Sequence, residues 1–238
     1  MTLLTTRGLD RRFGGVHAVR GVDLDVSPGE VVGLFGPNGA GKTTLFNLIA
    51  GSFRPDSGQV LLQGKDITGL PAWRRARLGI GRTFQVTRPF RDLTTIENLL
   101  TGVPRKGSTR SHDADLARTL LAKVGLAERA DELAGRLTLG MLKRLEVARV
   151  LAIDPTLLLL DEPLAGLTSR EATEILDLIV SLKAGIGIVM VEHNVRQSLP
   201  VCDRAVVMDA GKIISSGTPE QVRTDPKVVQ AYFGEKDD

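Results

Sequence analysis

The sequence is organised around Val31-Val32-Gly33-Leu34-Phe35-Gly36-Pro37-Asn38-Gly39-Ala40-Gly41-Lys42-Thr43-Thr44. An apolar run expected to form a strand leads here into a glycine-rich turn, and a short apolar helix is expected over residues 45–50. The spacing fits the P-loop pattern, in which backbone N–H groups of a tight loop and a helix N-terminus converge on nucleotide phosphates. A glycine-rich turn that binds nothing is the alternative, and the strand–loop–helix setting favours the phosphate site.

Each residue type in this loop has a physical task. Glycines permit positive φ and close approach of the backbone to a ligand. Lys42 supplies positive charge for the β and γ phosphates, and the Thr43 hydroxyl is a hard oxygen suited to Mg²⁺. The sequence therefore predicts ATP and Mg²⁺ as cofactors, with a cradle made of Gly36, Pro37, Asn38, Gly39, Ala40, Gly41, Lys42, Thr43 and Thr44.

Composition sets limits on the class of protein. The chain has 238 residues, of which 42% are hydrophobic and 25% charged, enough for one subdivided domain or two small ones. Its longest apolar runs have strand length, far short of the roughly 20 residues that a membrane-spanning helix needs. We expect no secretory signal and a cytosolic location, because the start lacks a basic and apolar leader and Cys202 is the one cysteine. A net charge of +3 and 4% aromatic residues argue against nucleic acid as a partner.

The first thirty or so residues favour a small antiparallel sheet, because apolar and polar residues alternate over short runs. Phe13 lies there between basic and glycine residues, where strand alternation explains an apolar ring poorly. The ring either stacks on a nucleotide base or is an ordinary aromatic residue at a sheet edge. Both interpretations stay open on these residues alone.

Residues 86–137 have the character of a helical insertion. Glycine and β-branched residues become sparse, and residues 113–124 carry an apolar stripe at helical spacing. Residues 104–112 are polar and basic and predict a loop. A second amphipathic helix follows residues 137–141, and we expect its Lys143 to lie off the apolar face. We therefore expect one domain over 1–238, with 1–85 and 138–238 as the nucleotide-binding core and 86–137 as a helical subdomain.

Two apolar runs end in chemically active side chains. Residues 157–160 run into Asp161 and Glu162, and residues 186–191 lead to Glu192-His193. Ligands bind at the carboxyl ends of strands in open α/β sheets, so both pairs belong beside the P-loop. Adjacent acids on a strand point to opposite sides, so one can serve Mg²⁺ through water while the other faces the γ-phosphate. His193 is an active-site candidate, although a lone histidine is usually structural.

Taken in order, these motifs resemble those of the ATP-binding subunits of ABC transporters. The resemblance covers the whole chain and includes TFQ at 83–85, the signature-like LTLGM at 137–141, LLLLDEP at 157–163, AGLT at 165–168 and VEH at 191–193. It implies an α/β fold with a P-loop NTPase (RecA-like) core, an antiparallel β subdomain and an inserted helical subdomain. It also implies a head-to-tail dimer with ATP between the P-loop of one subunit and the signature loop of the other.

The resemblance also implies a role for individual residues. Glu162 is implied as the general base and His193 as a γ-phosphate contact, while Gln85 helps to ligate Mg²⁺ with Thr43 and Asp161 and relays to the membrane subunit. Further nucleotide contacts are implied for the adenine ring and for the phosphate held by the opposite subunit: Phe13, Thr138 and Gly140.

Within the family, several stretches are similar to subunits that power branched-chain amino-acid importers and relatives for urea or amides: residues 79–85, 95–100, 144–149, 191–195 and 217–235. This implies a Mg²⁺-dependent ATPase on the cytoplasmic face of the cell membrane, with a second nucleotide-binding subunit, integral membrane permease subunits and, indirectly, a solute-binding protein. The chain departs from the family pattern at Met141 and Leu142, where polar residues are usual. We expect weak ATP-driven dimerisation because a thioether offers the phosphate no donor.

Two other functions compete with this interpretation. A soluble ABC-type protein that uses ATP-gated clamping as a switch would usually carry two cassettes, a long coiled coil or zinc-binding cysteines, and the sequence shows none of these. A P-loop kinase would leave Gly140, Glu162 and His193 without roles. The transport ATPase therefore accounts for more of the sequence than either alternative.

Overall fold

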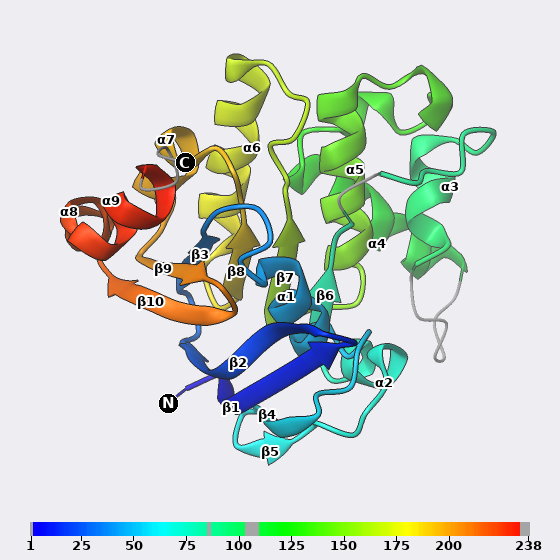
Figure 1. The fold of residues 1–238 in the computed structure, drawn as a ribbon. Coiled ribbons are helices and arrows are strands. Elements are labelled where there is room, and N and C mark those ends of the chain that lie inside the picture. The colour runs from blue at the N-terminus through cyan, green and yellow to red at the C-terminus, as the bar shows by residue number, and fades with distance from the viewer. Residues whose placement is uncertain (1, 85–86, 103–109, 234–238) are drawn as a thin grey trace.

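The computed structural model describes residues 2–84, 87–102 and 110–233, which build two sheets flanked by helices (Figure 1). The smaller, four-stranded sheet has the order β2-β1-β4-β5, and its neighbouring strands are antiparallel. This confirms the antiparallel sheet that the alternation near the N-terminus predicted. Its strands are β1 (Leu4–Phe13), β2 (Val16–Val26), β4 (Ser57–Leu62) and β5 (Lys65–Asp66).

The larger, six-stranded sheet has the order β10-β9-β3-β8-β7-β6. Its pairs are parallel from β9 to β6, and β10 alone runs antiparallel to its neighbour β9. Strands β3 and β7, which precede the P-loop and the acid pair, are interior to the sheet. The strands are β10 (Lys212–Gly217), β9 (Arg204–Asp209), β3 (Val31–Phe35), β8 (Gly187–Val191), β7 (Leu157–Asp161) and β6 (Ile80–Arg82).

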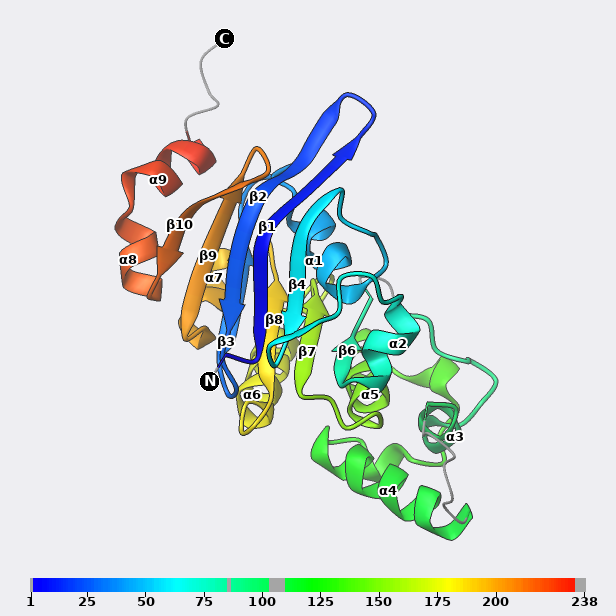
Figure 2. The same cartoon turned by 90° about the horizontal axis from the view of Figure 1, so that it is seen from below.

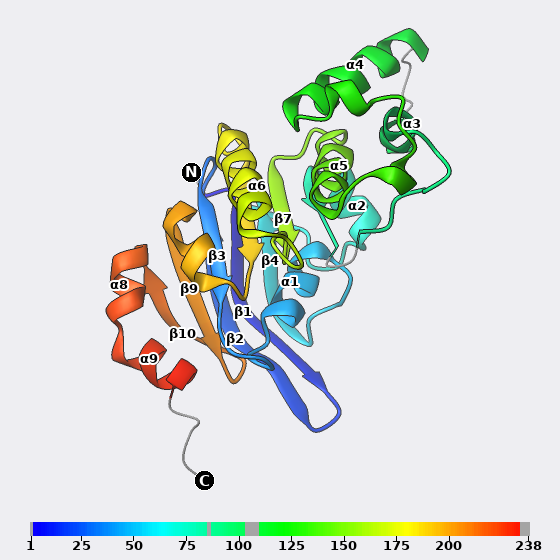
Figure 3. The same ribbon diagram turned by 90° about the horizontal axis from the view of Figure 1, so that it is seen from above.

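The central strands are buried on both faces, as their continuous apolar sequences predicted. Along β7, Leu157 and Leu159 belong to one hydrophobic core, while Leu158 and Leu160 belong to the other. The first core also contains the apolar residues of the four-stranded sheet and of α1 (Lys42–Ala50), so α1 lies between the two sheets (Figure 3). The second core is formed with α4, α5 and α6 on the opposite face.

Two groups of helices lie at opposite ends of the molecule. Figure 2 shows α3 and α4 at one end and α8 and α9, beside β10, at the other. The helices after α1 are α2 (Ala72–Arg77), α3 (Thr95–Leu100), α4 (Arg110–Lys123), α5 (Leu139–Leu151), α6 (Ser169–Leu182), α7 (Val195–Ser198), α8 (Pro219–Thr224) and α9 (Pro226–Phe233). Three short 3-10 helices cover Ala127–Arg129, Ala134–Arg136 and Leu199–Val201. The described part of residues 86–137 is helical, whereas its status as a subdomain stays a prediction.

Three boundaries differ from the sequence predictions. Helix α1 begins at Lys42 rather than at residue 45, because Gly41 takes the left-handed N-cap conformation directly before it. Helix α4 begins at Arg110, within the predicted loop, whose residues 104–109 lie outside the described residues. The sequence favours a short helix near residues 219–223 followed by a polar tail. The structure forms α9 there instead, because the Asp225 carboxylate accepts the Lys227 N–H at 2.9 Å and so caps the helix.

Among the described residues, no helix is both long enough and apolar enough to cross a bilayer.

A buried arginine fixes the far end of the P-loop helix. Arg75 of α2 is 1% exposed, and its guanidinium donates to the carbonyls of Leu48 and Ile49 at 2.7 and 2.8 Å. It also donates to the carbonyls of Leu70 and Thr68 at 3.0 and 2.9 Å. Carbonyls in the last turn of a helix lack intrahelical partners, and a cation there opposes the helix dipole favourably. Burial lowers the pKa of Arg75 to about 10, so it stays protonated at neutral pH.

We expect Arg75→Met to lower the free energy of unfolding by about 3–5 kcal/mol, because it leaves buried carbonyls without donors. Urea unfolding followed by circular dichroism measures this change. Arg74→Met is the matched control, because Arg74 is the exposed neighbour on the same helix and should change stability by less than about 0.5 kcal/mol. Equal effects of the two substitutions would contradict the role given to Arg75.

Candidate active site

The loop between β3 and α1 is pressed against neighbouring backbone at two glycines. A Cβ added to Gly36, whose φ is 140°, would lie 2.1 Å from the Met208 carbonyl oxygen of β9. A Cβ on Gly41, at φ 99°, would lie 2.2 Å from the Ala18 carbonyl oxygen of β2. Any other residue would push the loop off both strands. The two glycines therefore seat the loop, while Asn38, Gly39 and Thr43 stay exposed and open to a ligand.

Gly36 is also held by side chains from both directions. Its N–H donates to the Tyr232 hydroxyl of α9 at 2.7 Å, and its carbonyl accepts the Lys42 ammonium at 2.7 Å. The ammonium also donates to the Pro37 carbonyl at 2.9 Å, so the Lys42 charge lies within the loop. Burial lowers the pKa of Lys42, and the carboxylate of Glu162 opposes that shift. A phosphate would supply the anionic partner that favours the charged amine.

The carboxylate of Asp161 ends β7 beside α1. Along this strand, side-chain alternation puts residue 161 on the same face as Leu157 and Leu159, which pack with α1. Arg82 donates to this carboxylate at 3.2 Å and to the Asn47 side chain of α1 at 2.6 Å. Burial raises the pKa of Asp161, against the opposing charge and hydrogen bond of Arg82. A divalent cation would favour its ionised form, and an aspartate with the exposed Thr43 hydroxyl is a donor set that fits Mg²⁺.

Glu162 has an unusual backbone. Its φ is +48°, in the left-handed region that non-glycine residues seldom adopt. Its N–H donates to the Val191 carbonyl of β8 at 3.0 Å, and its own carbonyl accepts the Lys143 ammonium at 3.2 Å. Lys143 was expected off the apolar face of α5, but it is 5% exposed and reaches inward to this carbonyl. The turn at Glu162 breaks the alternation and carries its side chain away from a simple strand position.

The two predicted catalytic side chains meet. His193 Nε2 lies 3.0 Å from Glu162 Oε1, although the residues follow different strands. The Glu162 side chain is 15% exposed and that of His193 is 46% exposed, so the pair faces the open end of the site. A carboxylate in hydrogen-bond reach of a histidine can accept a proton from a bound water. The proximity that the strand ends predicted is therefore present in the structure.

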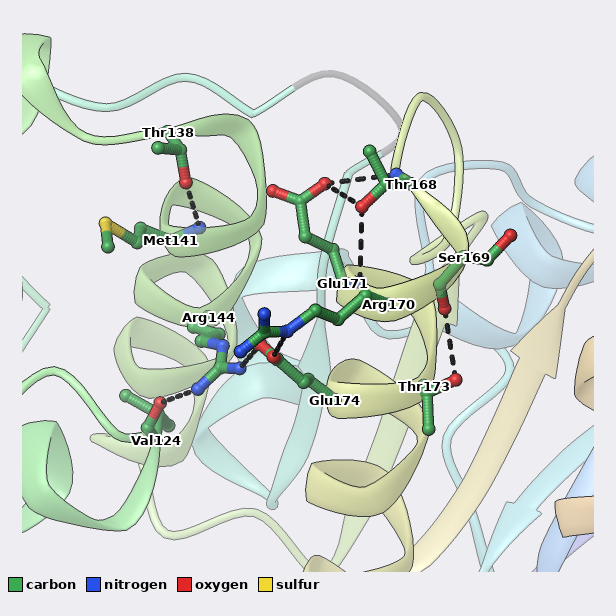
Figure 4. A network of polar contacts seen from close by, with 10 residues as sticks. All are labelled: Val124, Thr138, Met141, Arg144, Thr168, Ser169, Arg170, Glu171, Thr173 and Glu174. Atoms are coloured by element: carbon green, nitrogen blue, oxygen red, sulfur yellow. Dashed lines mark hydrogen bonds and ion pairs between the residues drawn. The ribbon is translucent and has the colours of Figure 1, made fainter.

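The signature-like segment forms the N-terminus of α5 (Figure 4). The Thr138 hydroxyl oxygen caps the helix by accepting the Met141 N–H at 3.3 Å, which leaves the hydroxyl hydrogen free to donate. Gly140 lies close to α6, because a Cβ there would be 2.9 Å from Glu171 Oε1. Further along the two helices, Arg144 of α5 forms an ion pair with Glu174 of α6 (Figure 4). Backbone N–H groups at a helix start suit an anion, as predicted for this segment.

Two predicted residues are not joined to this site by the structure. Phe13, at the end of β1, is 39% exposed and packs edge-on against Phe53 with ring centroids 5.4 Å apart. The Arg11 guanidinium stacks on the Phe13 ring, with its Cζ 4.7 Å from the ring centroid. The exposed face is compatible with base stacking, which stays a prediction. Gln85 lies outside the described residues, so its metal and relay roles also stay predictions.

Sequence reasoning missed two residues that support the loop and the acid pair. Tyr232 was placed in a polar tail, and only its aromatic character among apolar neighbours hinted at a packed helix. Lys143 appeared as one charge of an amphipathic helix, and no local signal indicated that it points inward. Contacts of this kind join distant parts of the chain, so spacing along the sequence does not indicate them.

Comparisons with known proteins indicate the family of the chain. A family model described as "ABC transporter" matches residues 19–165, and one described as "Branched-chain amino acid ATP-binding cassette transporter" matches residues 212–238. Among solved structures, the chain is similar to the crystal structure of the ADP conformation of an ATP-binding cassette of an ABC transporter. The TM-score is 0.90 at 34% identity, covering 99% of this chain and 100% of that one.

Curated relatives of similar length carry two transport functions. The chain is 42% identical over 250 residues to the high-affinity branched-chain amino acid transport ATP-binding protein LivG of Escherichia coli (strain K12), covering 98% of each. It is 41% identical to the lipopolysaccharide export system ATP-binding protein LptB of Haemophilus influenzae, covering 99% of each.

The fold and the P-loop site together define an ATP-binding, ATP-hydrolysing protein with an α/β P-loop NTPase core. The chain belongs to the ABC transporter family, as an ATP-binding subunit.

We expect Lys42→Ala to weaken ATP binding by about 10- to 100-fold, because a hydrogen bond to a charged group is worth about 1.5–3 kcal/mol. Isothermal titration calorimetry with ATP measures the change. Lys65→Ala, at an exposed lysine of β5, is the control and should leave the affinity unchanged. An unaltered ATP affinity in Lys42→Ala would show that the ammonium does not bind phosphate.

Proposed function

We propose that this chain is the ATPase subunit of an importer for branched-chain amino acids or a related small polar solute. The observation that carries the proposal is the match of residues 212–238 to the branched-chain family model. This segment lies outside residues 19–165, which match the general ABC transporter model, so it adds information on the kind of transporter. It contains β10, α8 and α9, and its Tyr232 contacts the P-loop. The 41% identity to LptB supports a second candidate, the ATPase of a lipopolysaccharide exporter.

The geometry supports a specific division of labour in hydrolysis. Glu162 accepts the proton of the attacking water, and His193 at 3.0 Å orients that carboxylate and contacts the γ-phosphate. Lys42 and backbone N–H groups of the loop from Asn38 to Thr44 bind the β and γ phosphates, and Phe13 stacks on the adenine. Thr43, Asp161 and Gln85 hold Mg²⁺, which when bound neutralises phosphate charge. In a head-to-tail dimer, Thr138 would donate to ATP on the second subunit, and Gly140 would let the helix start approach it closely.

An exposed groove is suited to the membrane partner. It has a volume of about 390 Å³ and is lined largely by α2, β6 and α5, with Trp73 and Phe84 among its walls. Those two rings are 54% and 58% exposed, and Arg82 and Arg149 add positive charge. A short amphipathic helix with apolar and acidic side chains fits such a groove. We assign it to a cytoplasmic helix of a permease subunit, because Phe84 of the groove directly precedes Gln85 in sequence. On this proposal the chain lies peripherally at the cytoplasmic face of the membrane.

The soluble clamp remains the rival from another class. It shares the P-loop, Glu162 and His193, so the nucleotide site does not distinguish it from a transport ATPase. The exposed aromatic groove and the 42% identity to a transport subunit over 98% of the chain favour transport. A solute-binding protein then acts only indirectly, through the permease.

We expect Glu162→Gln to keep ATP binding and to lower turnover by about two to four orders of magnitude, because an amide cannot accept the proton of water. Phosphate release and calorimetry measure the two quantities. Glu128→Gln, at an exposed glutamate of a 3-10 helix, is the control with the same chemical change. Turnover within about threefold of wild type in Glu162→Gln would exclude this residue as the base.

We expect the chain to co-purify from its native membranes with permease subunits, and the reconstituted complex to transport leucine in an ATP-dependent way. Trp73→Glu should abolish co-purification, because it puts a charge against the apolar wall of the groove. Val180→Glu, at an exposed position of α6 outside the groove, should not. Co-purification is measured by pull-down and transport by uptake of labelled leucine into proteoliposomes. Lipopolysaccharide-dependent ATPase activity without leucine transport would favour the exporter instead.

A further inference from the structure

Glu192 is a buried acid that the hydrolysis scheme above leaves unused. It follows β8, directly before His193, and is 3% exposed. Its Oε1 accepts the Leu164 N–H at 2.7 Å, and its Oε2 accepts the His193 N–H at 3.1 Å. A third amide, that of Asn194, donates to Oε2 at 3.5 Å. One carboxylate therefore gathers backbone N–H groups from two loops that lie far apart in sequence.

These two loops carry the predicted catalytic pair. Leu164 lies two residues after Glu162, and His193 receives its backbone contact from Glu192 directly. The left-handed backbone of Glu162, at φ +48°, is a conformation that persists only where surrounding contacts hold it. The hydrogen bond that the Glu162 N–H donates to the Val191 carbonyl holds the start of this turn, and the one that the Leu164 N–H donates to Glu192 holds the segment after it.

We propose that Glu192 is a positioning residue for ATP hydrolysis. By accepting from Leu164 and His193 together, it sets the distance between Glu162 Oε1 and His193 Nε2, which is 3.0 Å. It acts through Glu162 and His193, to which the proposed function gives the contacts with water and the γ-phosphate. The proposal rests on the roles assigned to Glu162 and His193 in the proposed function.

The task requires a carboxylate. An ionised glutamate accepts hydrogen bonds at both oxygens, whereas a glutamine of the same shape offers one oxygen and an NH₂ group that cannot accept. Glu192→Gln would therefore face either Leu164 or His193 with a donor. The loop that faces this NH₂ group would lose its anchor, and a displacement of about 1 Å at a reacting group can cost about 100-fold in rate.

The same carboxylate is not favourable for folding. Burial raises the pKa of Glu192, against the hydrogen bonds from the amides of Leu164, Asn194 and His193, so the folded state resists its ionisation. A carboxyl group with a raised folded-state pKa contributes most stability at low pH and loses that contribution as pH rises through the folded pKa. A neutral glutamine avoids this cost at neutral pH. Loss of activity without loss of stability thus separates positioning from a structural role.

The experiment compares the full chain with Glu192→Gln, Glu162→Gln and the control Asp177→Asn, which changes an exposed acid on α6. Steady-state ATPase assays give kcat and KM, fluorescence of an ATP analogue gives affinity, and urea unfolding gives stability. We expect Glu192→Gln to lower kcat by about 10- to 100-fold. Its KM and ATP affinity should change by less than about threefold. Its unfolding midpoint should stay close to that of wild type, because removing the cost of burying a charge opposes the loss of one hydrogen bond.

Each other result overturns the proposal in a distinguishable way. If Glu162→Gln is inactive while Glu192→Gln keeps wild-type kcat, Glu192 does not position the pair. If Glu192→Gln loses stability and ATP affinity along with kcat, its role is structural. If Glu162→Gln keeps full turnover, the proposed base is wrong, and the positioning role falls with it.

Discussion

The burial of the six-stranded sheet on both faces is the constraint on which the rest of the structure depends. Strands β3, β7 and β8 are fully buried, so no polar side chain can lie within them without losing its hydration. Polar chemistry is thereby confined to the ends of the strands. Because these strands are parallel, their carboxyl ends meet at one edge, where the P-loop, the acid pair and His193 come together.

Much of this could be predicted from the sequence because the signals are local. The apolar run 157–160 before Asp161 and the Gly-Lys-Thr turn are each specified by a few adjacent residues, and both belong at the carboxyl ends of strands. The placement of Glu162 and His193 at the same edge of the sheet was expected on that basis. The start of α1 at Lys42 was misplaced and α9 was missed, because capping geometry depends on one φ angle or one carboxylate.

The contacts that hold the site rigid could not be predicted in this way. Lys143, Glu192 and Tyr232 each reach a backbone group in a segment that is remote in sequence, and their neighbours in sequence give no sign of it. Such links also explain the strained backbone at Glu162, since a left-handed glutamate is stable only where several neighbours fix it. The residues that bind a ligand are thus visible in the sequence, while those that support them emerge from the fold.

The contacts of Gly36 with β9 and α9 have a consequence for how the protein is made. The P-loop is translated early, yet the carbonyl of Met208 and the hydroxyl of Tyr232, which flank Gly36, belong to the last strands and the last helix. During synthesis the nucleotide loop emerges from the ribosome long before the surfaces against which it is seated. Since chains fold as they emerge, competence to bind ATP is acquired late, when the C-terminal helix has docked. A nascent or truncated chain would therefore not engage ATP as the finished subunit does.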